Sequence, residues 1–445
     1  MAQVLSVSNL DGAGIRVVRL QYPDLHGICR GKDLPVEAFE HAVAEGVNFV
    51  EAVMTVDLAH NVVSGFELGF PDFVARPDLA TLAALPWEPH VAVCLCDLHD
   101  GVSGEPHALD PRGALRRVLA QYAQLGYAVV LAPELEFYLC EPDASSPTGW
   151  RPYAGKDSPP YTVGHLADPR GILGTMMEAA EALGLEVIAG AHEYGRSQYE
   201  INLGHGEALA AADRAFRFKE LVKELAAREG LLATFMGKPF NGDEGSGLHV
   251  HVSLSGAGGT NAFADPQGED GLSALARQFM AGVLEHGAAM MAVLNPTVNA
   301  YRRINAEALV PTRACWGHDH RMTLVRVPRE RGRATRLETR VGDGTSNPYL
   351  AMTAVLAAGL DGIRRELQPP PPVSGFIYDL PEDALGAPLP TSFGEAMAAL
   401  DGDVALREAL GERLLDTFRA IKAAEQERFR TWVTDWEFRE YAERL

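Results

Sequence analysis

Residues 247–254 read GLHVHVSL, and their alternation of polar and apolar side chains decides the fold. In a β-strand, residues two apart share a face. One face therefore carries His249, His251 and Ser253, and the other carries only leucine and valine. The apolar face is suited to packing on helices. The polar face carries side chains that bind metals and anions.

Three further segments repeat this pattern. They are ELEF at 134–137, QYEINL at 198–203 and RLETRV at 336–341. A single strand of this kind is more typical of an antiparallel sheet with one solvated face. Four strands that carry Glu, His, Arg, Gln and Asn on one face favour a single sheet whose polar faces line a shared site.

In such a sheet the carboxylates of Glu134, Glu136, Glu200 and Glu338 converge, with His249 beside them. They could not all stay ionised without cations, because like charges raise one another's pKa. An oxygen-rich ligand set with a single imidazole suits Mg²⁺ or Mn²⁺ better than Zn²⁺ or copper. The pattern therefore predicts divalent cations at this site.

Arginines follow at high density in residues 321–340. Their guanidinium groups bind phosphate and carboxylate bidentately, and together with two metal ions they are typical of a phosphoryl-transfer site. Arg329 and Arg331, in the PRERGR loop, are expected to be solvated instead. The glycines of residues 242–247 would let backbone approach a ligand. No Walker A or dinucleotide-binding sequence is present.

Composition narrows the function classes. The 445 residues carry a formal net charge of −21, which argues against nucleic acid or an anionic membrane as a partner. The five cysteines form no Cys-x-x-Cys pair, and neither a signal-peptide pattern nor a membrane-length apolar run occurs. We therefore expect a cytoplasmic protein.

The chain divides near residue 106. Before it, we expect strands at 14–22, 48–54 and 91–97 and a helix at 36–45. Asp110 and Pro111 form a good helix start, so a helix is expected from there to Leu125. Beyond it, the sequence predicts helices at 170–183, 208–229, 270–292 and 346–366, and further helices after residue 392.

The same segments resemble the signature motifs of the glutamine synthetase family, in the family's order. The motifs are APELEFYL (132–139), AHEYGRSQYEINLG (191–204), FMGKPFNGDEGSGLHVHVSL (235–254), LNPTVNAYRRI (294–304) and RATRLETRVGDGTSNPYLA (333–351). With DLHGICRGK at 24–32, the resemblance covers nearly the whole chain. It implies an α+β fold, with a small β-grasp-like domain at 1–106 and a large catalytic domain at 107–445 that has a curved antiparallel sheet and flanking helices.

The resemblance also implies roles for matching positions. The implied metal ligands are Glu136, Glu193 and Glu200 for a first ion, and Glu134, His249 and Glu338 for a second. The implied ATP contacts are His251, Ser253, Arg321, Arg326, Arg333 and Arg336, with Arg321 also catalytic, near the phosphate being transferred. Gly245, Arg303 and Arg340 would hold the glutamate substrate.

The chemistry implied is that of the family. ATP phosphorylates the side-chain carboxylate of L-glutamate, and an amine then displaces phosphate from γ-glutamyl phosphate. Two or three Mg²⁺ or Mn²⁺ ions would serve each site. Active sites would form between subunits of a homo-oligomer, usually a dodecamer, with residues 24–32 and the region of Asp57 at the interface.

This sequence differs from the ammonia-using members of the family mainly at the positions that bind ammonium. The Asp-Gly-Ser-Ser segment of ammonia-using members is absent from FVEAVMTVDLAHNV (49–62), where Asp57 is the candidate substitute. The loop glutamate that takes the ammonium proton matches position 309, which is leucine, so Glu307 is the candidate base. Glu244 also replaces a frequent asparagine.

WGHDHR (316–321) and VTDWEFREY (433–441) look more like the glutamylpolyamine and glutamylethanolamide synthetase branch. We therefore expect a ligase whose acceptor is a polyamine, ethanolamine or another primary amine. A glutamine synthetase with a diverged loop, and a non-catalytic structural or regulatory relative, are the alternatives. Tyr378 resembles the tyrosine that is adenylylated in some members, but a packed tyrosine is the favoured interpretation.

Overall fold

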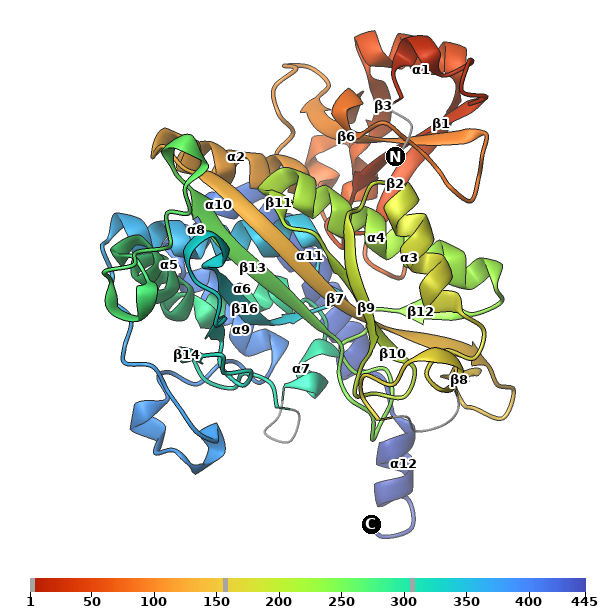
Figure 1. The fold of residues 1–445 in the computed structure, drawn as a ribbon. Coiled ribbons are helices and arrows are strands. Elements are labelled where there is room, and N and C mark those ends of the chain that lie inside the picture. Colours follow the sequence, from red (N-terminus) through yellow and green to blue (C-terminus); the bar gives the residue numbers. More distant parts are fainter. Residues whose placement is uncertain (1–4, 155–158, 305–308) are drawn as a thin grey trace.

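The computed structural model describes residues 5–154, 159–304 and 309–445, and two β-sheets organise them (Figure 1). The first sheet is built from residues 17–100 and the second from residues 128–343. The expected division near residue 106 falls between these two sheets. The expected α+β architecture, with a small N-terminal sheet and a larger sheet flanked by helices, is confirmed.

The N-terminal sheet has six strands in the order β2-β1-β6-β4-β3, with β5 beside β6. The strands are β1 (Val17–Pro23), β2 (Cys29–Pro35), β3 (Val47–Val50), β4 (Asp72–Pro77), β5 (Ala83–Ala84) and β6 (Val91–Asp100). Helix α1 (Val36–Glu45) has the predicted bounds. The strand predicted at 48–54 is wrong beyond Val50, because Glu51–Thr55 form a 3₁₀ turn that buries Glu51 against His107 and Arg413.

The second sheet has ten strands, and its main path runs β14-β15-β16-β13-β7-β10-β9. Its long strands are β7 (Ala128–Pro142) and β13 (Gly247–Ser255), flanked by β9 (Val187–His192), β10 (Gln198–Leu203) and β16 (Leu337–Asp343). The short strands are β8 (Trp150–Pro152), β11 (Gly206–Glu207), β12 (Leu232–Thr234), β14 (Trp316–His318) and β15 (Val325–Val327). All pairs are antiparallel except β14 with β15.

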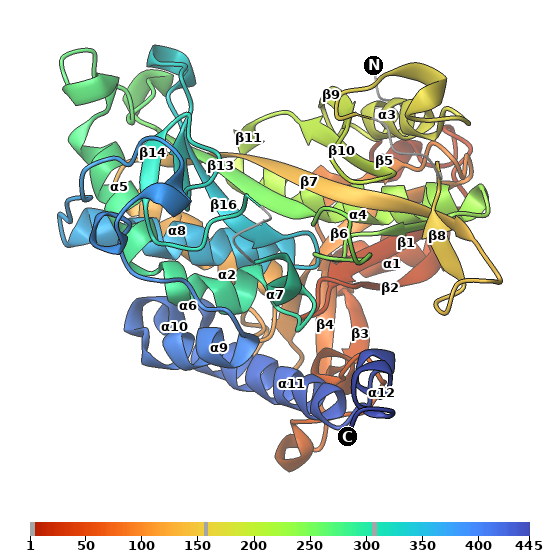
Figure 2. The same cartoon turned by 90° about the horizontal axis from the view of Figure 1, so that it is seen from below.

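Helices cover the apolar face of this sheet (Figure 2). The main helices are α2 (Pro111–Gln124), α3 (Ile172–Ala182), α4 (Ala208–Arg228), α5 (Ala274–Glu285), α6 (Gly287–Leu294), α7 (Ala300–Arg303) and α8 (Pro348–Arg364). The single helix predicted at 270–292 is wrong. The chain instead forms α5 and α6, which meet at His286, whose ring bonds Asp361 on one side and Asp403 on the other.

Two helix starts position the sheet and its helices. Asp110 caps α2 through the backbone N–H of Arg112, with Pro111 in the first turn as predicted. Asn347 caps α8, immediately after β16, by accepting from Tyr349 N and Leu350 N. A cap of this kind stabilises a helix by about 1 kcal/mol. The Asn347 cap starts α8 shortly after β16 ends at Asp343.

The C-terminal region is helical, as predicted. It forms α9 (Phe393–Gly402), α10 (Val404–Leu410), α11 (Glu412–Arg430) and α12 (Asp435–Tyr441). Helix α12 projects away from the rest of the molecule (Figure 1). Within the described residues, no helix is long and apolar enough to cross a membrane.

Candidate active site

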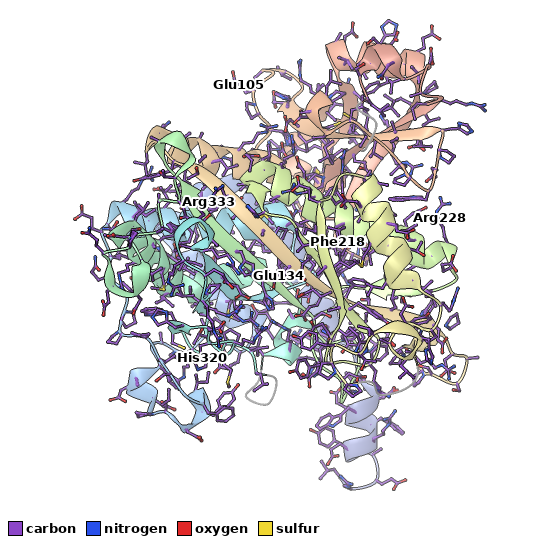
Figure 3. The ribbon with its side chains drawn as sticks, viewed as in Figure 1. Glu105, Glu134, Phe218, Arg228, His320 and Arg333 are labelled. Atoms are coloured by element: carbon purple, nitrogen blue, oxygen red, sulfur yellow. The ribbon has the colours of Figure 1, made fainter. Side chains whose placement is uncertain are left out.

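Strand register brings the predicted polar side chains together. His249 on β13 lies directly opposite Glu134 on β7, and Glu136 lies opposite Glu200 on β10. Directly opposed residues have Cβ atoms about 4.5–5.5 Å apart. His251 lies opposite Glu338 on β16, so four neighbouring strands contribute to one polar surface. Figure 3 places Glu134 near the centre of the molecule.

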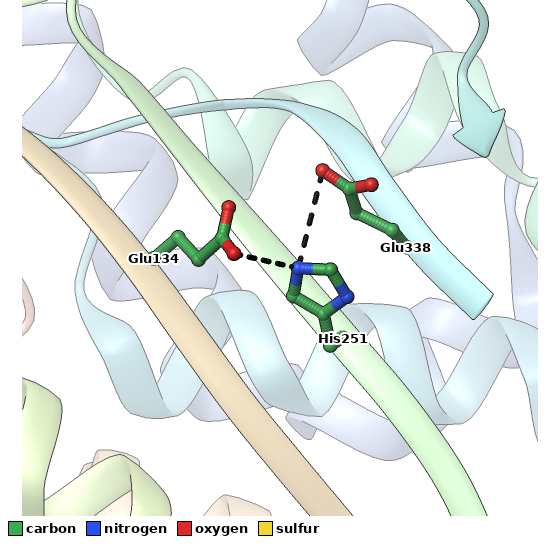
Figure 4. Close-up of side chains that lie close together, drawn as sticks. All are labelled: Glu134, His251 and Glu338. Atoms are coloured by element: carbon green, nitrogen blue, oxygen red, sulfur yellow. Dashed lines mark ion pairs between the residues drawn. The ribbon is translucent and has the colours of Figure 1, made fainter. Parts of the chain in front are cut away.

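Two carboxylates and two imidazoles form one end of this surface, and Figure 4 shows three of these groups, Glu134, His251 and Glu338. The Oε1 atom of Glu134 lies 3.0 Å from His251 Nε2, and its Oε2 atom lies 3.4 Å from His249 Nδ1. Glu338 Oε1 lies 3.8 Å from His249 Nδ1. Glu134 offers ligand atoms within 4.8 Å of His251 and Glu338, and likewise of Glu200 and His249. The spacing of the ligand atoms in either set is compatible with a metal ion.

Cations of the protein compensate the carboxylates at this end. Burial would raise the pKa of Glu134, but its hydrogen bonds with His249 and His251 outweigh burial and lower it. Burial also opposes ionisation of Glu338, yet Arg340 and the two histidines lower its pKa to about 2. Both groups are therefore carboxylates at neutral pH.

Glu136, Glu193 and Glu200 form the other end, and the balance there is reversed. Burial, together with the neighbouring carboxylates Glu136 and Glu134, raises the pKa of Glu193 to about 7, although Arg321 opposes the rise. Burial and the charges of Glu134, Glu136 and Glu193 raise the pKa of Glu200 further. This end lacks positive charge to match its carboxylates, which is the environment that a divalent cation would relieve.

Two of the predicted arginines hold Glu338. Arg326 donates to Glu338 Oε2 at 2.7 Å, and Arg340 donates to Glu338 Oε1. Asp319 braces Arg326 by accepting from its Nε and Nη2 atoms, at 3.1 and 2.6 Å. The guanidinium of Arg326 is therefore held between two carboxylates, one of which is a predicted metal ligand.

A cavity of about 620 Å³ opens beside this end of the site. Its lining includes four residues predicted to contact the nucleotide, namely His251, Ser253, Arg333 and Arg336. Glu134 also lines it. Arg336 Nε donates to His251 Nδ1 at 3.3 Å, so one predicted contact positions another. The volume is in the range of cofactor sites.

The predicted glutamate-binding residues are divided between the two ends, because Arg303 and Gly245 lie near Glu136 whereas Arg340 pairs with Glu338. Arg303 is 4% exposed and donates to the carbonyl of Val341 at 3.2 Å, and burial lowers its pKa. A Cβ on Gly245 would lie 2.6 Å from Arg303 Cγ and 2.6 Å from the carbonyl of Gly237. Only glycine permits this close approach.

The three residues predicted to act in catalysis are placed differently. Arg321 lies close enough to Glu193 to lower its pKa, and its carbonyl accepts from Arg340. Glu307 lies outside the described residues. Asp57 is buried in the N-terminal region and accepts from the backbone N–H groups of Ala59 and Asn61 and from Arg428 of α11.

Sequence reasoning assigned no role to Gln198, which proves to be a positioning group. Its Nε2 atom donates to Glu136 Oε2 and to the carbonyl of Gly245, both at 3.0 Å. The backbone N–H of Gly247 donates to the same Glu136 oxygen at 2.7 Å. Gln198 lies two residues before Glu200 and therefore on the same polar strand face, and this position could have indicated its role from the sequence. Asp319 was missed as well, because it lies in a loop with no periodicity.

Comparisons with known proteins identify the family of the chain. A sequence model of the family described as glutamine synthetase, catalytic domain, matches residues 108–441. The chain is 36% identical to the glutamine synthetase of Methanococcus maripaludis over 96% of both chains. It is 33% identical to a glutamate–isopropylamine ligase of a Pseudomonas species over 99% of this chain and 98% of that one. The solved structure of a GmaS/ADP complex has a TM-score of 0.88 and 33% identity, with both chains fully covered.

The fold and the polar site define an enzyme that joins glutamate to an amine. The chain belongs to the glutamine synthetase family, and the isopropylamine ligase and GmaS relatives fit its γ-glutamyl-amine branch. The hypothesis of a non-catalytic relative is therefore set aside.

Proposed function

We propose that this enzyme forms a γ-glutamyl amide from L-glutamate and a primary organic amine, at the expense of ATP. An oxygen of the glutamate side-chain carboxylate attacks the γ-phosphorus of ATP, and ADP leaves. The amine nitrogen then attacks the carbonyl carbon of γ-glutamyl phosphate and loses one proton to a general base, and phosphate leaves with the electrons of the broken C–O bond. The acceptor is a polyamine, ethanolamine or another primary amine.

The residues present fit divalent cations. Glu136, Glu193 and Glu200 supply only oxygen ligands, and the raised pKa values of Glu193 and Glu200 are those of carboxyls that lack a cation. Glu134, His249 and Glu338 would hold a second ion. Bound Mg²⁺ or Mn²⁺ would neutralise charge on the transferring phosphoryl group.

Hydrogen bonding separates the roles of the two histidines. Arg336 donates to His251 Nδ1, so a neutral His251 carries its proton on Nε2, which faces Glu134. A protonated nitrogen cannot ligate a metal ion, which leaves His251 a hydrogen-bond donor on the nucleotide side. His249 has no such arginine among its contacts with described residues and can present Nδ1 as a ligand.

The arginines perform the remaining electrostatic work. Arg333 and Arg336 line the cavity beside Glu134 and would hold ATP phosphates there. Arg321, near Glu193, would face the phosphate being transferred. Arg303 and Arg340 would grip the glutamate carboxylates. Fixed guanidinium groups stabilise developing negative charge without having to reorganise.

The proposal of an organic amine as acceptor rests on the absence of the ammonium-site pattern from this sequence. Leucine occupies position 309 and is 55% exposed, so this position supplies no carboxylate. The carboxylate of Asp57 is held by its own turn and by Arg428, which leaves it poorly placed to bind ammonium. The isopropylamine ligase relative supports an organic acceptor. The glutamine synthetase relatives at 36% identity keep ammonia as the second candidate.

Phosphate release, assayed with glutamate, ATP and Mg²⁺, tests the acceptor. Ammonium, putrescine, spermine, ethanolamine and isopropylamine are added one at a time, and the amide product is identified by mass spectrometry. We expect one or more organic amines to give a kcat/KM far above that of ammonium. Robust turnover with ammonium and none with organic amines would establish the enzyme as a glutamine synthetase.

We further propose that the active enzyme is a homo-oligomer, and that the oligomer is a dodecamer. The C-terminal segment supports this, because Trp432, Trp436 and Phe438 are 73%, 62% and 72% exposed in the single chain. Exposed aromatic residues at this density mark an interaction surface. Sedimentation of the full-length chain, compared with a Trp432→Ser, Trp436→Ser variant, tests it. A monomeric native enzyme that turns over normally would contradict the proposal.

A further inference from the structure

A second cavity, of about 230 Å³, lies away from the polar sheet face. It is enclosed by the segment Leu25–Ile28 of the N-terminal region, by α4, by α11 and by the turn that leads from β16 into α8. Three lysines and one histidine line it, namely Lys219, Lys223, Lys422 and His26. The sequence contains six lysines in all, so half of them meet at this one cavity.

Two of these lysines are almost completely buried. Lys219 is 4% exposed and Lys422 is 3% exposed. Burying an ammonium group is costly unless it is paired with an anion or hydrogen-bonded on all sides. Their positions therefore need an explanation beyond ordinary surface solvation, because lysines are almost never fully buried without a partner.

Two of the three cavity lysines already have carboxylate partners. Glu425 accepts from Lys422 at 3.0 Å, and Glu220 accepts from Lys223 at 3.1 Å. Asp24 pairs with Arg30 at 2.8 Å. Asp343 accepts from Thr345, and burial raises its pKa to about 6.

Lys219 is the exception to this pairing. Within the described residues its Nζ atom donates to one acceptor, the carbonyl of Ser346, at 2.9 Å, and it lies 5.6 Å from the centre of the Phe235 ring. Two of its three donor positions thus have no acceptor in that part of the chain. In keeping with this, burial lowers the pKa of Lys219 to about 7.

We propose that this cavity binds a small oxyanion, such as inorganic phosphate or a short-chain carboxylate, held by Lys219, Lys223 and Lys422. The anion supplies the acceptors that Lys219 lacks and the counter-charge that its ammonium group lacks. Leu25, Ile28 and Val293 in the lining leave room for a short apolar portion of the ligand. The site lies outside the proposed catalytic residues and does not depend on the identity of the amine.

The cavity also touches segments that lead to the active site. Thr297 lines it, six residues before Arg303, and Thr345 and Asn347 line it directly after β16. His26, on another wall, lies 3.1 Å from the carbonyl of Val56, next to Asp57. The cavity is therefore lined both by the N-terminal region and by segments that precede Arg303 and follow β16.

Isothermal titration calorimetry of the full-length protein with inorganic phosphate, and separately with succinate, tests the proposal. An Arg336→Gln background removes a phosphate-binding side chain of the catalytic site from the measurement. We expect Lys219→Met to weaken binding about tenfold or more, the effect of losing a charge-assisted hydrogen bond. Lys223→Gln, at the more exposed rim, should weaken it less, and the arm that binds tighter identifies the anion.

Lys32→Gln is the matched control, because Lys32 is an exposed lysine of β2 that bonds the carbonyl of Asn48 outside the cavity. It should leave binding unchanged. Lys223→Gln keeps the test decisive if Lys219→Met does not fold. Absence of binding in the parent protein, or equal binding in Lys219→Met, Lys223→Gln and the control, would overturn the proposal whether or not the enzyme turns over.

Discussion

The two ends of the polar sheet face differ in how their carboxylates are compensated. Glu134 and Glu338 are surrounded by His249, His251 and the arginines Arg326 and Arg340, which hold their pKa values down. Glu193 and Glu200 face other carboxylates, and their pKa values rise. Protein side chains already offset the carboxylates of the first end. The second end carries more carboxylates than nearby positive groups, although Glu136 and Glu200 arise from the same strand pattern.

The largest expected effect on turnover comes from Glu338, at the end of the site where histidines and arginines offset the carboxylates; we call this the compensated end. Replacing Glu338 with alanine removes a proposed metal ligand and leaves Arg326 and Arg340 without their shared carboxylate. We expect turnover to fall by about a hundredfold or more, since even outer contacts of metal sites are worth 10–100-fold. Steady-state kinetics measures this, with sedimentation and circular dichroism as controls for assembly and folding. Retained activity would show that the proposed ligand set is wrong.

Gln198 tests whether the carboxylate-rich end depends on positioning. Gln198→Leu removes the donor to Glu136 and to the Gly245 carbonyl but retains the size of the side chain. We expect the Mg²⁺ concentration for half-maximal activity to rise roughly tenfold. Gln198→Glu is the contrasting variant, because it adds a carboxylate beside Glu136. We expect it to impair activity more than Gln198→Leu does. Identical Mg²⁺ dependence in both variants would remove Gln198 from the site.

Stability against pH separates the two ends directly. The folded pKa of Glu193 is about 7, above its ordinary value of 4.5, so its contribution to stability is present at low pH and is lost as pH rises through 7. The contribution of Glu338 to stability changes with pH in the opposite direction, because its folded pKa is about 2, below its ordinary value of 4.5. This contribution is present above pH 4.5 and is lost as pH falls toward 2.

Metal-free protein should therefore become less stable between about pH 5 and pH 7, by at most about 1.4 kcal/mol per pH unit for each such group. Urea unfolding in EDTA measures this slope, and Mg²⁺ should flatten it by binding the ionised carboxylates. Glu193→Gln should flatten it without metal. A slope that is the same in Glu193→Gln as in the parent protein would place the titration elsewhere.

Strand periodicity was sufficient to predict the polar sheet face and the side chains that meet on it. Alternation assigned Glu134, Glu136, Glu200, His249 and Glu338 to one face, and cross-strand register brought them together. Periodicity failed where tertiary contacts override it. The break at His286 follows from two aspartates distant in sequence, and the 3₁₀ turn at Glu51 follows from His107 and Arg413. The bracing by Asp319 and the lysine cavity likewise join segments that no local pattern connects.

The smallest expected effect comes from a matched pair of arginines that share Asp319. Arg329 is 85% exposed in its side chain and pairs with Asp319 at 2.6 Å, whereas Arg326 is 15% exposed and also holds Glu338. Exposed ion pairs contribute about 0.2–1 kcal/mol, since solvent screens them. Arg329→Gln should therefore leave the KM for ATP within about twofold of the parent value.

Arg326→Gln should raise that KM strongly or lower kcat, because it removes one of the two guanidinium groups that hold the buried Glu338 carboxylate. The difference between the two variants measures what burial adds to the same guanidinium–carboxylate contact. Equal effects would mean that the loop bearing Arg329 orders the nucleotide side of the site through Asp319. The compensated end would then depend on a solvent-facing brace as well as on its buried arginines.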